Sequence, residues 1–268
     1  MTPKDSETWD EADVLGVQVS AIGLERAVAL ALRSIQAGKS GYICASGVHG
    51  VMEAQADPSF RSILNGAFLN LPDGMPMTWV GRFQGYTQMD RVFGPDFMKA
   101  LCQASAGTGY RHFLYGGAPG VAEELKQSLE HLAPGLLVVG TYTPPFRELT
   151  QDEEEDLFNL LRESQPHIVW VGLSTPKQER FMAQYAARMQ ATLMIGVGAA
   201  FDYHTGRIND SPRWIKRAGL QWLHRLLQDP RRLWRRYLRN NPAFLWKIIL
   251  QMLRQRHTAR PRRASTIL

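Results

Sequence analysis

The feature that most constrains the fold is a repeated pattern in which a short apolar run ends at a glycine-rich turn and a helix-like segment follows. Runs of this kind lie at residues 42–45, 67–71, 111–115, 167–171 and 192–197, and residues 136–141 form a further β-rich run without the glycine turn. Short apolar strands that alternate with helices are typical of a parallel sheet buried on both faces. The sequence therefore predicts an α/β fold with a mainly parallel sheet and helices on both of its faces.

The turns that follow these runs are the first candidate binding positions. Ligands of such sheets bind beyond the carboxyl ends of the strands, where small residues let backbone N–H groups approach a phosphate. Residues 113–120 form one such strand, turn and helix start, but match neither GxGxxG nor a P-loop, so a plain tight connection fits equally well. The positions assigned to substrate binding on this basis are Ser46, Gly74, Tyr115, Gly116, Gly117 and Gly198.

Asp73 is the strongest candidate for acid–base chemistry. It follows a short strand and precedes a glycine, so its carboxylate can project into a pocket at the sheet edge and accept a proton from an attacking hydroxyl. The alternative is structural, because Pro-Asp-Gly is also a common turn sequence. Spacing alone leaves both interpretations open.

Polar side chains also gather after two later strands. Thr175, Lys177 and Gln178 place a hydroxyl, a cation and an amide at a strand end and helix start, although Thr175 could be a plain helix cap. Asp202 follows the last strand and could bind a ribose or sugar hydroxyl, or cap the next turn. His49 lies near a site loop and is also assigned to substrate binding, although a lone histidine is more often structural.

Several other classes of protein are excluded or disfavoured. The acidic run at residues 152–156 begins a predicted helix, where negative charge is favourable, and is not a DxD motif. The histidines show no HExxH or other metal-ligand spacing, so no metal cofactor is expected. No GxSxG nucleophile motif occurs either. Cys44 and Cys102 are far apart, which favours a reducing compartment. The polar N-terminus is not a signal peptide, and no run is apolar enough to span a membrane.

Charge divides the chain near residue 210. The net charge is +6, yet residues 211–268 carry fifteen Lys or Arg and one acidic residue, so the body is acidic. We predict a flexible leader over 1–13, a catalytic domain over 14–210, a basic helical appendage over 211–256 and a disordered tail over 257–268. The appendage is expected to contain helices at about 213–228, 230–240 and 242–256. An anionic surface is the expected partner of the appendage.

Helical spacing separates two kinds of side chain within the appendage. Arginines 232, 235, 236 and 239 fall on one side of a helix, and Leu233, Trp234, Tyr237 and Leu238 fall on the other. A second stripe comprises Phe244, Leu245, Ile248, Ile249 and Met252. Aromatic residues opposite the arginines favour a membrane interface over nucleic acid, which would require the two to interleave. A packed helical subdomain with solvated arginines is the remaining alternative.

Six ordered motifs resemble the WecG/TagA/CpsF family of bacterial glycosyltransferases between about Val14 and Ile249. They are residues 71–76 (LPDGMP), 91–96 (RVFGPD), 113–117 (FLYGG), 171–179 (VGLSTPKQE), 196–202 (GVGAAFD) and the segment from 212–214 (PRW) to 235–237 (RRY). The resemblance implies a Rossmann-like sheet with an appendage that completes the site at the membrane.

The resemblance also implies an activity. It is the inverting transfer of a hexose or N-acetylhexosamine from a UDP-sugar to a polyprenyl-diphosphate-linked saccharide, for teichoic acid, capsule or exopolysaccharide synthesis. N-acetylmannosamine, its uronic acid and glucose are all compatible donors. The family needs no metal, and a cytoplasmic enzyme peripheral on the inner face of the plasma membrane is expected. Oligomeric state is left open.

Residue roles carry over by motif. Asp73 resembles the proposed general base, Arg91 the arginine that steadies the leaving diphosphate, and Gln178 a sugar-contacting residue; Asp96 closes the second motif. Arg225, Arg232 and Arg235, with Arg236 and Arg239 beside them, would meet the lipid diphosphate or head groups. The chain departs from the family at Ala45 and Gly47, where many members have Thr and Asn. The rival functions are a nucleotide-regulated nucleic-acid-binding or scaffold protein, and a UDP-sugar hydrolase or epimerase of the same fold.

Overall fold

The computed structural model describes residues 8–188, 193–255 and 265–266. Strands β1 (Thr8–Trp9) and β2 (Glu11–Val14) already occupy most of the second half of the predicted leader, and β1 pairs with β10 (Ser265–Thr266). Residues 1–7, and all of the predicted tail except the two residues of β10, lie outside the described residues.

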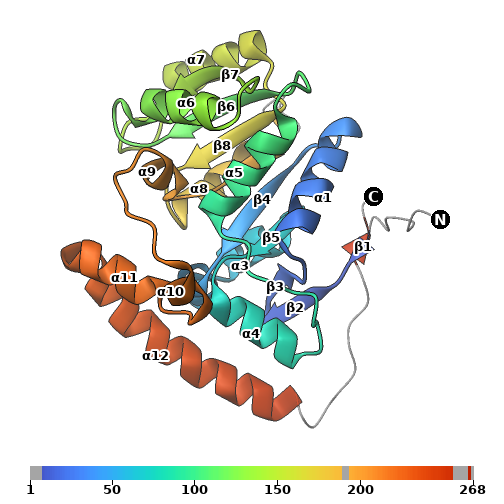
Figure 1. Ribbon diagram of the computed structural model, residues 1–268, viewed down its shortest axis with the longest axis vertical. Coiled ribbons are helices and arrows are strands. Elements are labelled where there is room, and N and C mark those ends of the chain that lie inside the picture. The colour runs from blue at the N-terminus through green and yellow to red at the C-terminus, as the bar shows by residue number, and fades with distance from the viewer. Residues whose placement is uncertain (1–7, 189–192, 256–264, 267–268) are drawn as a thin grey trace. The chain divides into compact units, whose positions relative to one another are not determined.

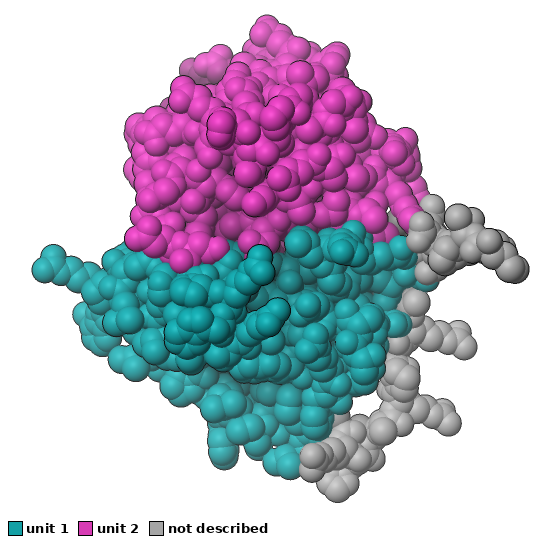
Figure 2. Space-filling model, in the orientation of Figure 1, with its two compact units in different colours: residues 1–26, 46–93, 211–268 teal, residues 27–45, 94–210 magenta. Residues whose placement is uncertain are grey.

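The chain divides into two compact units that interleave along the sequence. Unit 1 comprises residues 1–26, 46–93 and 211–268, and unit 2 comprises residues 27–45 and 94–210 (Figure 2). The boundary predicted near residue 210 coincides with the return of the chain to unit 1. The sequence did not reveal that the appendage would group with two N-terminal segments.

Unit 2 contains five parallel strands in the order β4-β9-β8-β6-β7 (Figure 1). The chain runs outward from β6 to β7 and then returns to the other side of β6, so the order reverses between β6 and β8. Ligands of open α/β sheets bind at such a reversal. The strands are β4 (Gly41–Ser46), β6 (Arg111–Gly116), β7 (Leu137–Tyr142), β8 (Ile168–Gly172) and β9 (Leu193–Gly196).

The helices of unit 2 form two groups. Helices α5 (Gly94–Ser105), α6 (Val121–Leu132) and α9 (Ala200–His204) contact one another, and Figure 1 shows α5 in front of the strands. Helices α7 (Gln151–Ser164) and α8 (Lys177–Tyr185) meet through Phe158 and Tyr185. The sheet core includes the large rings of Trp170, Phe113 and Phe97, which are fully buried. The predicted α/β class is confirmed.

Local signals set several boundaries as expected. The predicted helix that begins at the acidic run 152–156 is α7, and its start has a capping box: Thr150 accepts from Glu153 N–H and the Glu153 carboxylate accepts from Thr150 N–H. Helix α1 (Leu24–Gln36) places its apolar residues at helical spacing, with Ala27, Leu30, Ala31 and Ile35 buried. These signals succeed because they depend on residues within one or two turns.

Unit 1 has a hairpin, three complete helices of the N-terminal half and the appendage. The hairpin joins β2 to β3 (Val17–Ser20). The other elements are α2 (Val48–Ala56), α3 (Pro58–Asn65), β5 (Leu69–Pro72), α4 (Met75–Phe83), α10 (Arg213–Arg217), α11 (Gln221–Gln228) and α12 (Pro230–Gln255), with α1 beginning in this unit. Among the described residues, no helix is long and apolar enough to cross a membrane.

The appendage has helix boundaries that differ from the prediction. The helix expected over 213–228 is interrupted at Gly219, whose φ is +71° and whose missing Cβ would lie 2.5 Å from the Trp79 ring. The break expected at Pro242 is wrong, because α12 continues through it. A proline inside a helix lacks one N–H donor. The continuous helix α12 packs against α2 and α11, and these tertiary contacts accompany its continuation through Pro242.

Helix α12 also sorts its apolar residues differently from the prediction. Leu233, Phe244 and Ile248 are buried, with Asn240 between them. The side chains of Trp234, Leu238, Leu245, Trp246, Ile249 and Leu253 are exposed. The apolar stripe that was predicted as a single surface is therefore divided into two sides of α12. One side is packed into unit 1, and the other is open to solvent.

Candidate active site

The backbone of Asp73 is held closely at the end of β5. Its N–H donates to the carbonyl of Ser46 over 3.0 Å, and a Cβ on Gly47 would lie 2.8 Å from the Asp73 carbonyl oxygen. Gly74 follows with φ of +113°, a conformation that favours glycine, and precedes α4. The Pro-Asp-Gly sequence thus forms a turn whose position depends on the β4–α2 loop.

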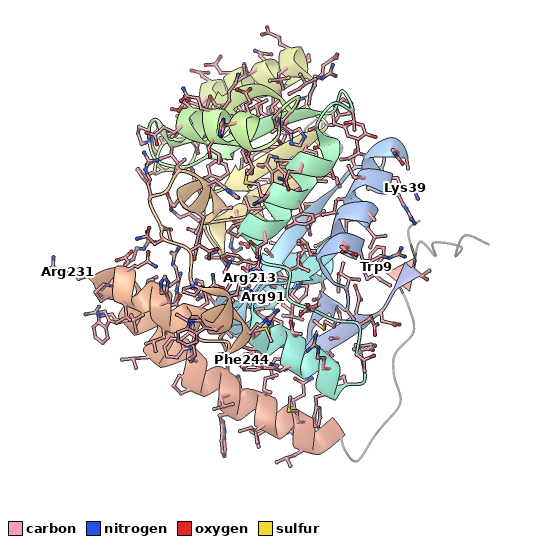
Figure 3. All side chains as sticks on the ribbon, viewed as in Figure 1. Trp9, Lys39, Arg91, Arg213, Arg231 and Phe244 are labelled. Carbon is pink, nitrogen blue, oxygen red and sulfur yellow. The ribbon has the colours of Figure 1, made fainter. Side chains whose placement is uncertain are left out.

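Arg91 lies on the segment adjacent to Asp73. The N–H of Val92 donates to the carbonyl of Pro72 over 2.9 Å, which joins the two segments one residue from each side chain. The Arg91 guanidinium lies 4.4 Å from the centre of the Phe93 ring and donates from Nη2 to Gln221 Oε1 over 2.6 Å. Figure 3 shows Arg91 near the part of the appendage that carries Arg213. Unit 1 therefore brings both predicted catalytic residues onto neighbouring segments.

The glycine turn predicted in unit 2 lies at the strand-order reversal. Gly116 pairs with Gly172 across β6 and β8, and a Cβ on Gly116 would lie 2.6 Å from the Gly172 carbonyl oxygen. Gly117 has φ of +79°, and its N–H donates to the same oxygen over 3.1 Å. The Phe201 ring fills the space that a Cβ on Gly172 would occupy, and a Cβ on Gly117 would lie 3.0 Å from Val121 and 3.3 Å from the same ring. The backbone there is closely packed around this ring.

A buried polar network joins the β8–α8 and β9–α9 loops. Gln178 Oε1 accepts from Gly198 N–H over 3.0 Å, and Gln178 Nε2 donates to Glu179 Oε1 over 3.0 Å. Thr175 Oγ1 donates to the same carboxylate oxygen over 2.8 Å. Gln178 and Glu179 are only 2% and 1% exposed, and burial raises the pKa of Glu179. Three predicted residues, Thr175, Gln178 and Gly198, are thus connected directly.

The remaining predicted residues of unit 2 differ in exposure. Lys177 is exposed, while Asp96 and Asp202 are half-buried in the first turns of α5 and α9. His204, the last residue of α9, contacts the start of α5, because its Nε2 lies 3.0 Å from the Pro95 carbonyl. Burial lowers the pKa of His204, and Asp96 opposes that effect.

Tyr115 is buried rather than facing an open pocket. Its ring stacks 4.3 Å from Phe181 and 5.7 Å from Tyr142, measured between ring centres. Burial is the main reason that the pKa of its hydroxyl is raised. Its side chain thus packs β6 against α8, and a role in substrate contact stays a prediction.

His49 connects α2 to the appendage. Its Nδ1 lies 3.2 Å from Asn240 Nδ2 of α12 and 3.6 Å from Glu53 Oε1 of its own helix. Ser46, three residues earlier, is buried and offers its carbonyl to Asp73. The structure therefore gives both residues contacts that position the β4–α2 loop, and direct contact with substrate stays a prediction.

The appendage arginines fall into different environments. Arg232 pairs with Asp229 over 2.9 Å, and Arg235 lies over Trp234 at 5.2 Å from the ring centre. Arg236 lies over Tyr237, and its Nε is buried without a hydrogen-bond partner among the described residues. Arg225 is half-buried on α11, while Arg239 is exposed on α12. In the part of the chain that is described, no group of His, Cys, Asp and Glu could hold a metal ion.

Comparison with known proteins decides the family. A model of the glycosyl transferase WecG/TagA/CpsF family matches residues 12–258. The chain belongs to this family. A relative from Bacillus spizizenii is 28% identical over 200 residues, which are 75% of this chain and 76% of that protein. It is named N-acetylglucosaminyldiphosphoundecaprenol N-acetyl-beta-D-mannosaminyltransferase.

Membership of the WecG/TagA/CpsF family confirms the resemblance drawn from the six motifs and the prediction of a glycosyltransferase. It favours that prediction over a nucleic-acid-binding or scaffold protein. The roles of individual residues are not decided by membership, so those of Asp73 and Arg91 stay predictions.

Four residues of the site region were not assigned from the sequence. Gly47, Phe93 and Gln221 contact Asp73 or Arg91, and Glu179 joins Thr175 to Gln178. Glu179 and Phe93 lie inside the motifs at residues 171–179 and 91–96, so the sequence could have indicated a role for both. Gln221 is 130 residues from Arg91, so no local pattern could indicate the contact.

Gly47→Ala is expected to lower turnover by ~10-fold or more. The backbone at Gly47 is extended, so the added Cβ would act by displacing Asp73 rather than by straining residue 47. Displacements of about 1 Å can cost ~10²-fold in rate. Steady-state transfer kinetics and the melting temperature would be measured together.

Gly23→Ala is the matched control, because its Cβ would meet only the Asp90 Cβ at an ordinary 3.7 Å. Equal turnover in the two variants would contradict the close approach at Gly47.

Proposed function

We propose that this glycosyltransferase moves a sugar from a UDP donor to a saccharide carried on polyprenyl diphosphate, with inversion at the anomeric carbon. Family membership over residues 12–258 is the observation that carries the proposal. The name of the Bacillus spizizenii relative supports an N-acetylmannosaminyl group as donor sugar and a diphosphoundecaprenol-linked acceptor. The uronic acid and glucose remain alternative donors.

In the proposed reaction, a hydroxyl oxygen of the acceptor attacks the anomeric carbon while the bond from that carbon to the UDP oxygen breaks. The Asp73 carboxylate takes the hydroxyl proton. Arg91 offers positive charge to the departing diphosphate. The Pro72–Val92 hydrogen bond supports this assignment, because it places the two residues on adjacent segments.

The test is a panel of UDP-sugars offered with a polyprenyl-diphosphate-linked N-acetylglucosamine acceptor, with products identified by mass. We expect one added sugar per acceptor and persistence of turnover in a chelator. Sugar release or epimerisation without acceptor consumption would instead identify a hydrolase or epimerase.

We also propose that the enzyme works on the inner face of the plasma membrane, bound through the appendage. Of the fifteen large hydrophobic side chains exposed in the described residues, eleven lie between Trp214 and Leu253. Clustered exposed apolar residues mark interaction surfaces, and the surrounding arginines suit anionic head groups. The open stripe of α12 gives this surface an interfacial helix.

Trp246→Asp is expected to weaken binding to anionic vesicles by ~10-fold or more, because a large ring leaves the interface and a negative charge replaces it. Trp246 is 64% exposed, so the fold should tolerate the change. Flotation with vesicles of phosphatidylglycerol and phosphatidylcholine would measure the effect.

Phe146→Asp is the control, since Phe146 is 90% exposed but lies in unit 2. Retention of the wild-type protein on DNA, without flotation on vesicles, would overturn the membrane proposal.

A further inference from the structure

One aromatic ring in unit 1 holds cations from two distant parts of the chain. The Phe93 ring centre lies 4.4 Å from the Arg91 guanidinium carbon and 5.6 Å from Lys216 Nζ of α10. Each cation is attracted to the ring by the ring's quadrupole, although the two cations repel each other. The two cations concentrate positive potential beside residues 91–93. This segment lies next to Asp73, because Val92 N–H donates to the carbonyl of Pro72.

Gln221 holds Arg91 without neutralising it. Its Oε1 accepts from Arg91 Nη2 over 2.6 Å, so it fixes the plane of the guanidinium through a neutral amide. Among the described residues, the Arg91 side chain forms no ion pair with a carboxylate; its other contact is with Phe93. The remaining N–H donors of Arg91 keep the planar fork that matches phosphate oxygens.

We infer that Arg91 and Lys216 together bind a diphosphate group, and that Gln221 is a positioning residue for Arg91. The guanidinium supplies directed hydrogen bonds and the lysine supplies a point charge. The inference rests on the proposed function, to which it adds a second cation and its support. The diphosphate is that of the UDP donor or that of the lipid-linked acceptor, and the two are separated by experiment.

Lys216→Ala is the first test, on the full-length protein. Calorimetry would measure the affinity for inorganic diphosphate and for UDP, and transfer kinetics would give KM for the lipid-linked acceptor. We expect the affinity for inorganic diphosphate to fall by ~10-fold, as for the loss of one charged contact. Lys216→Arg should restore most of it. Lys126→Ala removes an equal charge from α6 of unit 2, outside the appendage, and should leave all three quantities within about 2-fold.

Gln221→Glu tests the positioning role. A carboxylate at this site would pair with Arg91 and compete with the ligand, so diphosphate affinity should fall by ~10-fold or more while the melting temperature does not fall. Gln221→Ala should lower kcat and weaken diphosphate binding less than Gln221→Glu does. A merely structural glutamine would instead lose melting temperature and diphosphate affinity together.

The outcomes separate the two sources of diphosphate. Weaker UDP binding in Lys216→Ala assigns the site to the donor, whereas a raised acceptor KM with unchanged UDP affinity assigns it to the lipid. If Lys216→Ala matches Lys126→Ala in all three measurements, the inference is overturned. Wild-type protein that binds diphosphate but transfers no sugar would instead overturn the proposed function and leave the binding site standing.

Discussion

Asp73→Asn is expected to lower turnover by ~10²-fold or more while UDP binding persists. The amide keeps the size of the carboxylate but cannot take the proton of the attacking hydroxyl, a step worth typically ~10²–10⁴-fold. The backbone contacts of residue 73 with Ser46 and Gly47 involve main-chain atoms and should survive the change. Turnover with saturating substrates and calorimetric UDP affinity would be measured on the same preparation.

Asp152→Asn provides the control, because Asp152 is an exposed residue of the first turn of α7. It should retain turnover close to that of the wild type. Near-normal turnover of Asp73→Asn would remove Asp73 from the role of general base. Loss of UDP affinity in the same variant would point to a broader disturbance of the site.

Phe244→Ala is expected to destabilise unit 1 by ~3 kcal/mol or more. Phe244 is 6% exposed on the inner side of α12, and removing a buried phenyl ring loses its transfer free energy and leaves a cavity. Figure 3 marks the position of this residue on the helix. Denaturant unfolding would give the free energy, and hydrogen exchange of α2 would show whether the loss reaches the element against which α12 packs.

The adjacent residue supplies a matched comparison. Leu245 is 60% exposed, so Leu245→Ala should change the free energy of unfolding by only about 0.5 kcal/mol. Its effect should instead be on vesicle binding, because it removes part of the open stripe. Equal destabilisation by both substitutions would contradict the division of α12 into a packed and an open side.

Helix α12 is bound to the N-terminal segments of unit 1 by side-chain hydrogen bonds as well as by apolar packing. Gln251 donates to the Asp13 carbonyl and accepts from Leu15 N–H, and Asn240 contacts His49, so α12 is tied to the hairpin and to α2. A chain ending near residue 209 would lose these contacts together with the burial of Phe244. Single substitutions on the open side of α12 test membrane binding without that loss.

Much of the fold was predictable because its signals are local. The apolar runs, the capping box at Thr150 and Glu153, and the glycine turn at residues 116–117 each depend on a few neighbouring residues. The α12 boundaries were not predictable, since Asn241–Pro242 resembles a helix start and only packing against α2 and α11 accompanies its continuation. Local propensity is a weak determinant wherever tertiary contacts are extensive.

The candidate site also has a part that the sequence predicted and a part that it did not. Motif order alone indicated the family, which the family model over residues 12–258 confirms. The same contiguous motifs singled out Asp73 and Arg91, whose roles stay predictions. The contacts that position these two residues could not be predicted. Gly47 lies against the backbone carbonyl of Asp73, which any residue type would carry, and Gln221 contacts Arg91 from 130 positions away in the sequence. A sequence shows which chemical groups are present, whereas a long-range contact depends on the tertiary path that brings distant segments of the chain together.

By itself, the sequence determined the α/β class, the division of charge between body and appendage, and the family. Each follows from composition, period or contiguous motif, which do not require a three-dimensional arrangement. Only the tertiary structure decided that the appendage belongs to unit 1, that one side of α12 is packed while the other is open, and that Gln221 reaches Arg91. These are long-range contacts, and their formation depends on burying apolar surface across segments that the sequence keeps far apart.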